Sequence, residues 1–329
     1  MSSSPPSPLL AGLTVLERGW LSSNNVVIHG APGEAGAVLV DSGHVVHAAQ
    51  TLALVKHALQ RADGTAQPLA RIVNTHLHSD HCGGNALLQR ELAGVPIVIP
   101  PGEAEAVRQW DVERLSHDDF GRRERFTIAG TLAPGDHFTA AGRRWEAHAA
   151  PGHDPHSLVL FDATHGVLLS ADALWANGFG VVFPELIGES GFAEVAATLD
   201  MIERLPVRLV VPGHGAPFAD VAQALARARS RLAAFRADPA RHARHAAKVI
   251  VKYHVMEERS LARAELLHWA ATAPLVRDVW QRFGRGGEGA AASAAQWIDG
   301  FIDELLAAGV IGREPGGAGA AAQERIVDR

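Results

Sequence analysis

A short segment rich in His and Asp is the part of this chain whose residue types and spacing could do chemistry. His76-Leu-His78-Ser-Asp80-His81 places four metal-ligand side chains within six residues, directly after the apolar run Arg71–Thr75. Residues two apart at the end of a strand point to the same side, so His76 and His78 are predicted to face one way and Asp80 and His81 another. Imidazole and carboxylate groups suit zinc or iron. One His near a strand end is usually structural, but four ligand-type residues in one turn indicate a metal site.

The elements that must position this segment follow an alternating pattern. Five short apolar runs predict strands, and two amphipathic stretches between them predict helices. The strands are expected near residues 14–17, 26–29, 37–41, 71–75 and 95–99, and the helices near 48–62 and 85–92. This alternation predicts an α/β fold, in which a cluster at the carboxyl end of a strand lies in an open crevice.

The segment and four further motifs carry a family resemblance. Thr75-His76-Leu-His78-Ser-Asp80-His81-Cys-Gly-Gly84-Asn85 resembles the signature of the metallo-β-lactamase superfamily. The other motifs resemble that family's markers in the same order along the chain: Val38-Leu-Val-Asp41, Pro151-Gly152-His153-Asp-Pro155-His156-Ser157, Leu169-Ser-Ala-Asp172 and Val210-Val-Pro-Gly213-His214-Gly215. The resemblance covers about residues 12–235. It implies a four-layer αββα sandwich.

The resemblance also implies roles for individual residues. It assigns His76, His78 and His153 to one metal, Asp80, His81 and His214 to a second metal, and Asp172 to a bridge between them. The implied cofactor is two Zn²⁺ ions, with iron or manganese as alternatives because these ligands do not select one metal. A hydroxide shared by the metals would attack the substrate, with Asp80 and Asp172 as the catalytic carboxylates. Asp41 would accept a hydrogen bond from a ligand His or fix the signature loop.

Residues beside the motifs are weaker candidates. His156, three residues after His153, could contact substrate or donate a proton, but a role in supporting the metal ligands or in the structure is expected instead. Trp20, Trp175 and Phe179 flank the motifs and could line an apolar acyl pocket, although packing in the core is equally consistent with the sequence. Cys82 is interpreted as a small packing residue.

Composition and charge narrow the class of protein. The formal net charge is −6, and residues 241–329 hold 12 Lys and Arg against 11 Asp and Glu. Because neither part of the chain has an excess of basic residues, a nucleic-acid partner is not expected. The single cysteine excludes an intramolecular disulfide. The first residues do not resemble a secretory signal. The sequence contains no run of 18 apolar residues, so no membrane span is expected. A cytoplasmic enzyme with a small acyl substrate and no membrane partner is expected.

The domain organisation is predicted from a change in pattern near residue 240. Residues 1–11 are expected to be disordered and residues 12–236 to form the catalytic domain. Residues 240–313 are expected to form a mostly helical, winged-helix-like domain, and residues 314–329 a flexible Gly- and Ala-rich tail. This second domain is interpreted as a lid, a substrate wall or the surface of a homodimer.

The substrate is less well determined than the site. Hydroxyacylglutathione hydrolase (glyoxalase II) resembles this chain in its metal-ligand motifs and its added helical domain, which favours hydrolysis of a glutathione or coenzyme A thioester, or of an ester. A lactonase acting on acyl-homoserine lactones is the first alternative, but the only tyrosine, Tyr253, lies outside the predicted catalytic domain. A phosphodiesterase or nuclease is the second alternative. Such an enzyme would need a basic groove, and the counts of basic and acidic residues do not indicate one. A non-enzymatic binding module is the third, and seven filled ligand positions weigh against it.

Overall fold

The chain of 329 residues divides into two compact units, which are described separately. The structure is a computed structural model, and it describes residues 7–115, 121–286, 290–314 and 324–329. The first unit consists of residues 7–115, Arg122–Pro184 and Ser190–Leu232, and the second is built mainly from Ala233 onward. No helix in the described ranges has both the length and the apolar character needed to cross a bilayer.

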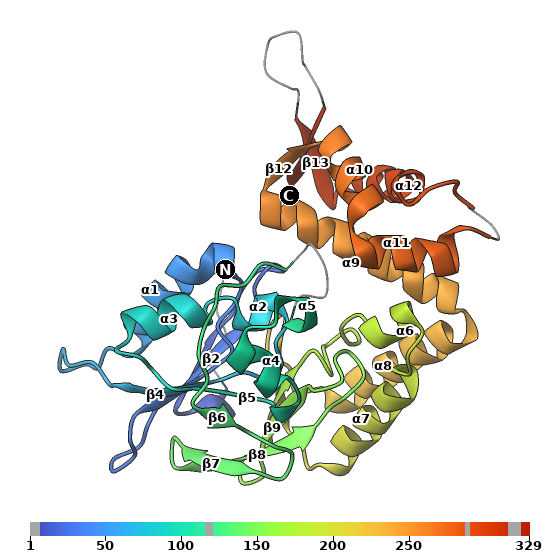
Figure 1. The fold of residues 1–329 in the computed structure, drawn as a ribbon. Helices are drawn as coiled ribbons and strands as arrows, with labels where there is room; N and C mark the ends of the chain where they lie inside the picture. Colours follow the sequence, from blue (N-terminus) through green and yellow to red (C-terminus); the bar gives the residue numbers. More distant parts are fainter. Residues whose placement is uncertain (1–6, 116–120, 287–289, 315–323) are drawn as a thin grey trace. The chain divides into compact units, whose positions relative to one another are not determined.

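The first sheet of the first unit has six strands in sequence order (Figure 1). Strands β1 to β3 pair in antiparallel fashion, and β3 to β6 pair in parallel. Every residue of β2 and β3 is buried, as expected for valine-rich strands covered on both faces. The strands are β1 (Leu13–Leu16), β2 (Asn25–Ile28), β3 (Ala37–Val40), β4 (Leu69–Val73), β5 (Ile97–Ile99) and β6 (Gly130–Thr131).

The second sheet has five strands in the order β11-β10-β9-β8-β7. Its pairs are antiparallel, except that β10 and β11 run parallel. The strands are β7 (His137–Ala140), β8 (Arg143–Ala149), β9 (Leu158–Asp162), β10 (Val167–Ala171) and β11 (Leu209–Pro212). The parallel pair brings the ends of β10 and β11, and therefore Asp172 and His214, to the same edge of the sheet.

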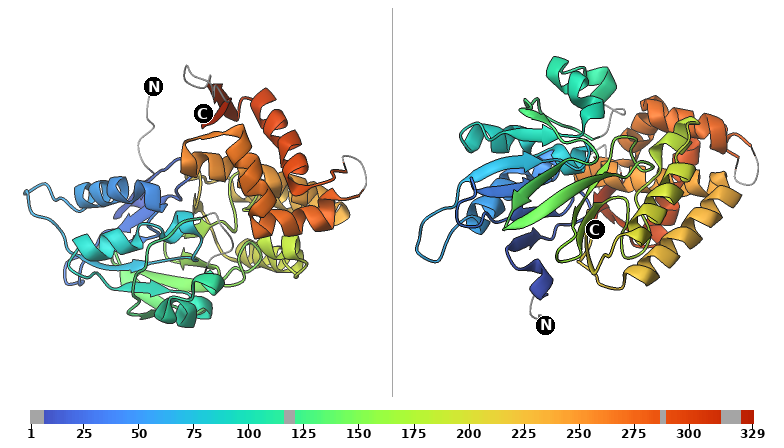
Figure 2. Two further views of the ribbon diagram at one scale, coloured as in Figure 1. Left: turned by 45° about the horizontal axis from the view of Figure 1, so that its top comes forward. Right: turned by 90° about the horizontal axis from the view of Figure 1, so that it is seen from below.

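The two sheets pack face to face. Val38 and Val40 of the first sheet share one apolar core with Trp145 and Leu160 of the second. The opposite face of the first sheet packs against three helices, α1 (Ala48–Ala58), α3 (Asn85–Glu91) and α4 (Ala104–Gln109). Helix α7 (Phe192–Arg204) and the start of α8 (Val221–Ala237) lie along the second sheet (Figure 2). The predicted α/β sandwich is therefore confirmed.

Short elements complete the first unit. Helices α2 (Ser79–Cys82) and α5 (Val112–Leu115) are single turns, and α6 (Phe183–Ile187) begins in this unit. Residues Pro8–Leu10 form a turn of 3₁₀-helix, and Arg143 donates a 2.9 Å hydrogen bond to the carbonyl of Leu9. The predicted disorder of residues 1–11 is therefore wrong for this turn, while residues 1–6 lie outside the described ranges.

The second unit combines helices with a small antiparallel sheet. Its elements follow the order helix, strand, helices, strand, strand, and the sheet order is β12-β14-β13. The winged-helix-like character predicted for residues 240–313 stays a prediction. The elements are α9 (Pro239–Glu258), β12 (Ser260–Ala262), α10 (Arg263–Thr272), α11 (Pro274–Val279), a π-helical turn (Trp280–Gly284), α12 (Ala294–Ala307), β13 (Ile311–Glu314) and β14 (Arg325–Asp328).

The predicted flexible tail from residue 314 is wrong at the end of the described chain. Arg325–Asp328 forms β14, the central strand of the sheet, and hydrogen-bonds to strands on both sides. Ile326 is fully buried. The prediction rested on the Gly and Ala content of the preceding residues, 315–323, which lie outside the described ranges.

Candidate metal centre

The signature segment lies directly beyond the end of β4 in the first sheet. His76 lies in a bend after this strand, His78 has extended backbone, and Asp80 and His81 lie in the single helical turn α2. The change from extended to helical backbone turns the second pair of side chains away from the first. Two groups of ligands therefore come from one segment of six residues.

Three histidines form the first group. The Nε2 atom of His76 lies 3.1 Å from Nδ1 of His78, which lies 2.7 Å from Nε2 of His153. His153 comes from the loop between β8 and β9, and its Nδ1 lies 2.5 Å from the carbonyl oxygen of Val181. Because that nitrogen is placed to donate to the carbonyl, Nε2 of His153 keeps its lone pair for the group.

Asp80, His81, Asp172 and His214 form the second group. Nε2 of His214 lies 3.0 Å from Oδ2 of Asp80, and Nε2 of His81 lies 3.3 Å from Oδ1 of Asp172. In each of the two groups, one ligand atom from every residue lies within 4.8 Å of the others. The structure therefore brings together all seven predicted ligand residues.

Asp172 lies between the two groups. Its Oδ2 is 3.3 Å from Nε2 of His153, and its Oδ1 is 3.3 Å from Nε2 of His81. One carboxylate thus presents an oxygen to each group. A Cβ atom at Gly213 would lie 2.3 Å from Oδ1 of Asp172, so any side chain there would displace this carboxylate.

The electrostatics of the second group fit a bound cation. Burial disfavours the charged imidazole of His81, but the carboxylates of Asp172, Asp41 and Asp80 outweigh it and raise the His81 pKa well above its ordinary value. Burial also opposes the charged form of Asp172, yet the neighbouring histidines, His81 first, lower its pKa. Nε2 of His81 is buried without a hydrogen-bond partner. A divalent metal would satisfy this nitrogen and the surrounding carboxylates together.

Asp41 makes both of the contacts predicted for it. Its Oδ2 lies 2.7 Å from Nδ1 of His81, and its two oxygens accept hydrogen bonds from the backbone N–H and the hydroxyl of Thr75. A proton on Nδ1 of His81 leaves Nε2 as the free ligand atom. Asp41 therefore orients one ligand and anchors the start of the signature segment.

A set of amides and hydroxyls that sequence reasoning missed also fixes the signature segment. The backbone N–H of Ser42 and the side-chain amide of Asn74 both donate to the carbonyl of His81, at 2.7 and 3.1 Å. Asn85 donates to Asn74 and accepts from Ser42. Buried polar side chains of this kind have no distinctive spacing, so the sequence offered no signal beyond Asn85 at the end of the signature.

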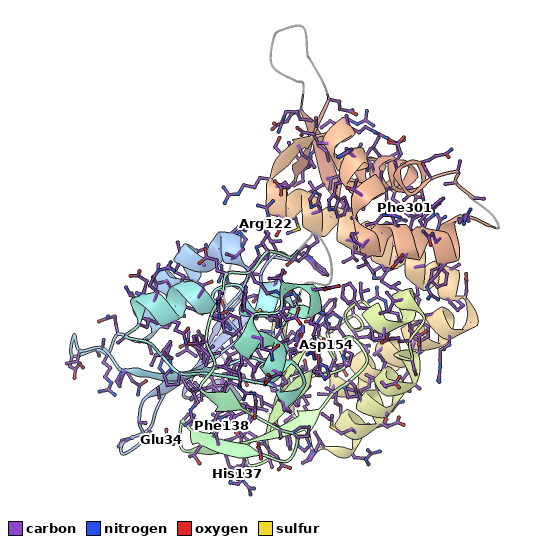
Figure 3. All side chains as sticks on the ribbon, in the orientation of Figure 1. Glu34, Arg122, His137, Phe138, Asp154 and Phe301 are labelled. Carbon is purple, nitrogen blue, oxygen red and sulfur yellow. The ribbon has the colours of Figure 1, made fainter. Side chains whose placement is uncertain are left out.

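The expectation for His156 is not supported by its surroundings. Its side chain is exposed and packs against Gly102, where a Cβ atom would lie 2.2 Å from Nδ1 of His156. The neighbouring Asp154, labelled in Figure 3, lies nearer to a ligand, since its buried Oδ2 is 4.0 Å from Nε2 of His78, a separation longer than a hydrogen bond. Asp154 was missed because it directly follows His153, and that predicted metal ligand already explained the motif.

Aromatic rings flank the two ligand groups. Trp20 and Trp175 pack around His214 beside the second group, whereas the ring of Phe183 lies 5.1 Å from that of His78 beside the first. Phe183, the first residue of α6, was missed because a single aromatic residue at the start of a short helix carries no pattern. Phe179 is only 2% exposed, so we correct its expected place in a substrate pocket to packing inside the protein.

The chain was compared with known families and proteins. Residues 18–214, more than half of the chain, match the metallo-beta-lactamase superfamily. Hydroxyacylglutathione hydrolase of Stenotrophomonas maltophilia is 28% identical over 178 residues, which are 54% of this chain and 55% of that relative. The chain thus spans little more than half the length of that curated relative. The acyl-coenzyme A thioesterase MBLAC2 of Gallus gallus is 24% identical over 224 residues, 63% of this chain and 79% of that protein.

The solved structures support the fold. A beta-lactamase domain protein from Burkholderia ambifaria matches 99% of this chain and 97% of its own, with a TM-score of 0.52 and 21% identity. At this identity the likeness shows the architecture alone.

Proposed function

Because this chain belongs to the metallo-β-lactamase superfamily, we propose that it is a dinuclear metal hydrolase that cleaves an ester or thioester, with an acyl thioester favoured. The observation that carries the proposal is the position of Asp172, with one carboxylate oxygen 3.3 Å from a ligand nitrogen of each group. A carboxylate in this position fits a bridge between two cations.

The chain's residues divide the work of such a site. His76, His78 and His153 would hold one cation, Asp80, His81 and His214 the other, and Asp172 both. Zinc is the proposed metal, and iron or manganese would fit the same ligands. Two bound cations supply Lewis acidity, which lowers the pKa of water and stabilises negative charge on a carbonyl oxygen.

Asp80 is the residue proposed to handle the proton of the attacking water. Its side chain is the more exposed of the two carboxylates in the second group, at 12% against 6% for Asp172. Its Oδ2 is held 3.0 Å from Nε2 of His214. Burial raises the pKa of Asp80, but His81 and His214 outweigh this and lower it, so the carboxylate is ionised and able to orient a water molecule near neutral pH.

The thioester substrate class is supported by the relatives. Two of them carry names of thioester hydrolases, acting on hydroxyacylglutathione and on acyl-coenzyme A. A lactonase is the first alternative, although the single tyrosine lies in α9 of the second unit. A phosphodiesterase is the second, and a net charge of −6 disfavours it.

A substrate screen with ligand variants tests the proposal. Zinc-loaded protein would be assayed on glutathione and coenzyme A thioesters, acyl-homoserine lactones and bis(p-nitrophenyl) phosphate. We expect thioester hydrolysis that falls at least about 100-fold in His78→Ala and Asp172→Ala. His165→Ala is the matched control, since its imidazole pairs with Asp162 rather than with a ligand group. Strong phosphodiester cleavage without thioester cleavage, or full activity in either ligand variant, would overturn the proposal.

A further inference from the structure

Trp20 is an exposed aromatic residue beside the second ligand group. It is 58% exposed and lies in the loop between β1 and β2. Large aromatic side chains lose favourable burial when they remain in water, so an indole left open next to a ligand group needs an explanation.

The loop that carries Trp20 is anchored to both segments that supply the second ligand group. The backbone N–H of Ser23 donates to the carbonyl of Asp80 at 2.9 Å, and that of Asn24 donates to the carbonyl of Gly213 at 2.6 Å. The side-chain amide of Asn24 donates to the carbonyl of Gly215 at 2.7 Å. These bonds hold the loop against the residues on either side of His214, so Trp20 has a fixed position relative to the ligands.

Trp20 forms a wall together with Trp175 and the imidazole of His214. The Trp20 ring stacks on His214 with centroids 5.6 Å apart and planes at 15°, and meets the edge of Trp175 at 5.6 Å and 83°. Trp175 in turn lies 5.3 Å from His214 at 77°. We call the rings of Trp20 and Trp175 the tryptophan wall.

Trp175 is also anchored to the ligand set. Its indole N–H lies 3.2 Å from the carbonyl of Ala171 and 3.3 Å from Oδ1 of Asp172, in donor geometry to both. Arg227 donates to the carbonyl of Ala176 at 3.0 Å and so secures the same loop from α8. The ring of Trp175 and the loop that carries Trp20 are therefore both tied by hydrogen bonds to segments that bear metal ligands.

The chemistry of the wall indicates which part of a thioester it would contact. Glutathione and coenzyme A are charged, hydrogen-bonding thiols, whereas the ring contacts of Trp20 and Trp175 are made to one another and to the imidazole of His214. Flat apolar surfaces favour aliphatic chains and, by offset or edge-on stacking, aromatic rings. The acyl group is the part of the substrate that can offer such a surface.

From this geometry we infer that the tryptophan wall is the acyl-binding subsite and that it selects thioesters with an apolar acyl group, aromatic ones above all, over small hydroxyacyl groups. The inference rests on the proposed thioesterase function and adds the class of acyl group to it.

Two substrate series separate the acyl side from the thiol side. In the first, benzoyl, hexanoyl and lactoyl groups are joined to one thiol, N-acetylcysteamine; in the second, the benzoyl group is joined to glutathione or coenzyme A. We expect kcat/KM for benzoyl to exceed that for lactoyl by about tenfold or more. Trp20→Ala should lower kcat/KM for benzoyl about tenfold, mainly through KM, and leave lactoyl within about twofold. Trp20→Phe should recover most of the loss.

A tryptophan elsewhere in the same unit provides the matched control. Trp110 packs edge-on against Phe126, with centroids 5.6 Å apart, and Trp110→Phe should leave the benzoyl preference unchanged. A preference for lactoyl, an equal loss on every acyl group in Trp20→Ala, or an effect that follows the thiol would overturn the inference.

A binding measurement distinguishes failure of the inference from failure of the proposed function. Titration of zinc-loaded protein with a benzoyl-group thioether, which cannot be hydrolysed, should quench tryptophan fluorescence, with a Kd about tenfold weaker in Trp20→Ala. If no thioester is cleaved but this difference persists, the proposed reaction fails and the subsite stands. Equal Kd values in the two proteins would overturn the subsite whatever the activity.

Discussion

Replacement of Asp41 by Asn tests how the structure prepares His81 for metal. Asp41 has a φ of 58°, a conformation that Asn also tolerates, so the backbone should persist. The amide oxygen can still accept from the N–H of Thr75, but an amide N–H₂ can then face Nδ1 of His81. That nitrogen would become an acceptor and the proton would move to Nε2, the atom that points into the ligand group.

The expected magnitude follows from the contact that is lost. The Asp41–His81 pair is 2.7 Å long and fully buried on the histidine side. Loss of a carboxylate that orients a ligand His typically weakens metal affinity 10- to 100-fold, or about 1.4–2.8 kcal/mol. Zinc affinity, measured by competition with a chromophoric chelator at pH 7.5, should therefore show one weakened site and one unchanged site in Asp41→Asn.

Asp162→Asn is the control for this experiment. Asp162 is a buried carboxylate that also lies 2.7 Å from an imidazole nitrogen, that of His165, and pairs with Arg143 at 3.1 Å. Its substitution should lower the melting temperature and leave both zinc affinities intact. Wild-type affinity at both sites in Asp41→Asn would refute the reasoning about tautomer and charge.

Three further predictions concern pH and the second unit. Burial and the nearby Asp154 carboxylate raise the pKa of Glu103 from 4.5 to about 8, so wild-type stability is lost as the pH rises from 4.5 through 8. Glu103→Gln should match wild type at about pH 4 and melt roughly 4–8 °C higher at about pH 8.5, for a gain of about 2 kcal/mol. Equal melting curves at both pH values would contradict this. The raised pKa of His81 means that a proton competes with metal at the second ligand group. The zinc affinity of that group should therefore fall about tenfold per pH unit below neutrality, as chelator competition between about pH 6 and 7.5 would show. A pH-independent affinity would exclude this competition. Ile326→Ala removes a fully buried side chain from β14 and should destabilise the second unit by about 2–4 kcal/mol in urea denaturation, whereas a flexible segment there would leave the curve unchanged.

The ligand set was the part of the site most open to prediction, for a physical reason. Metal ligands come from a few residue types, chiefly His, Cys, Asp and Glu, and few other roles put four such residues into one turn. The same holds for Asp41, since a metal-bound His needs an acceptor for its second nitrogen. Because these roles restrict which residue types can occur at each position, they produce a pattern that can be recognised in a single sequence.

The supporting residues left no comparable pattern. Ser42 and Asn74 donate hydrogen bonds to the carbonyl of His81, and Asn85 bonds to both of these residues. Many polar residues could occupy such positions. Asp154 was overlooked in favour of His156, because spacing along the chain does not reveal which of two neighbours faces inward. Phe179 and Trp175 were equal candidates by sequence, and only burial separates them.

The fold, like the site, has a part that could be predicted from local sequence pattern and a part that could not. Buried valine-rich strands and their alternation with helices determine the first unit. The end of the chain was misjudged because β14 is a short strand that gains its stability from pairing with β12 and β13 rather than from a strong local preference. Long-range pairing of this kind is invisible in local composition.

The most direct test of the account is the number of metal ions held per chain. Protein that has been stripped of metal, reconstituted with zinc and freed of excess by gel filtration would be measured by inductively coupled plasma mass spectrometry. The account predicts two zinc ions per chain in the wild type and about one in His214→Ala, which removes a ligand from the second group only. One ion or none in the fully reconstituted wild type would contradict the dinuclear centre.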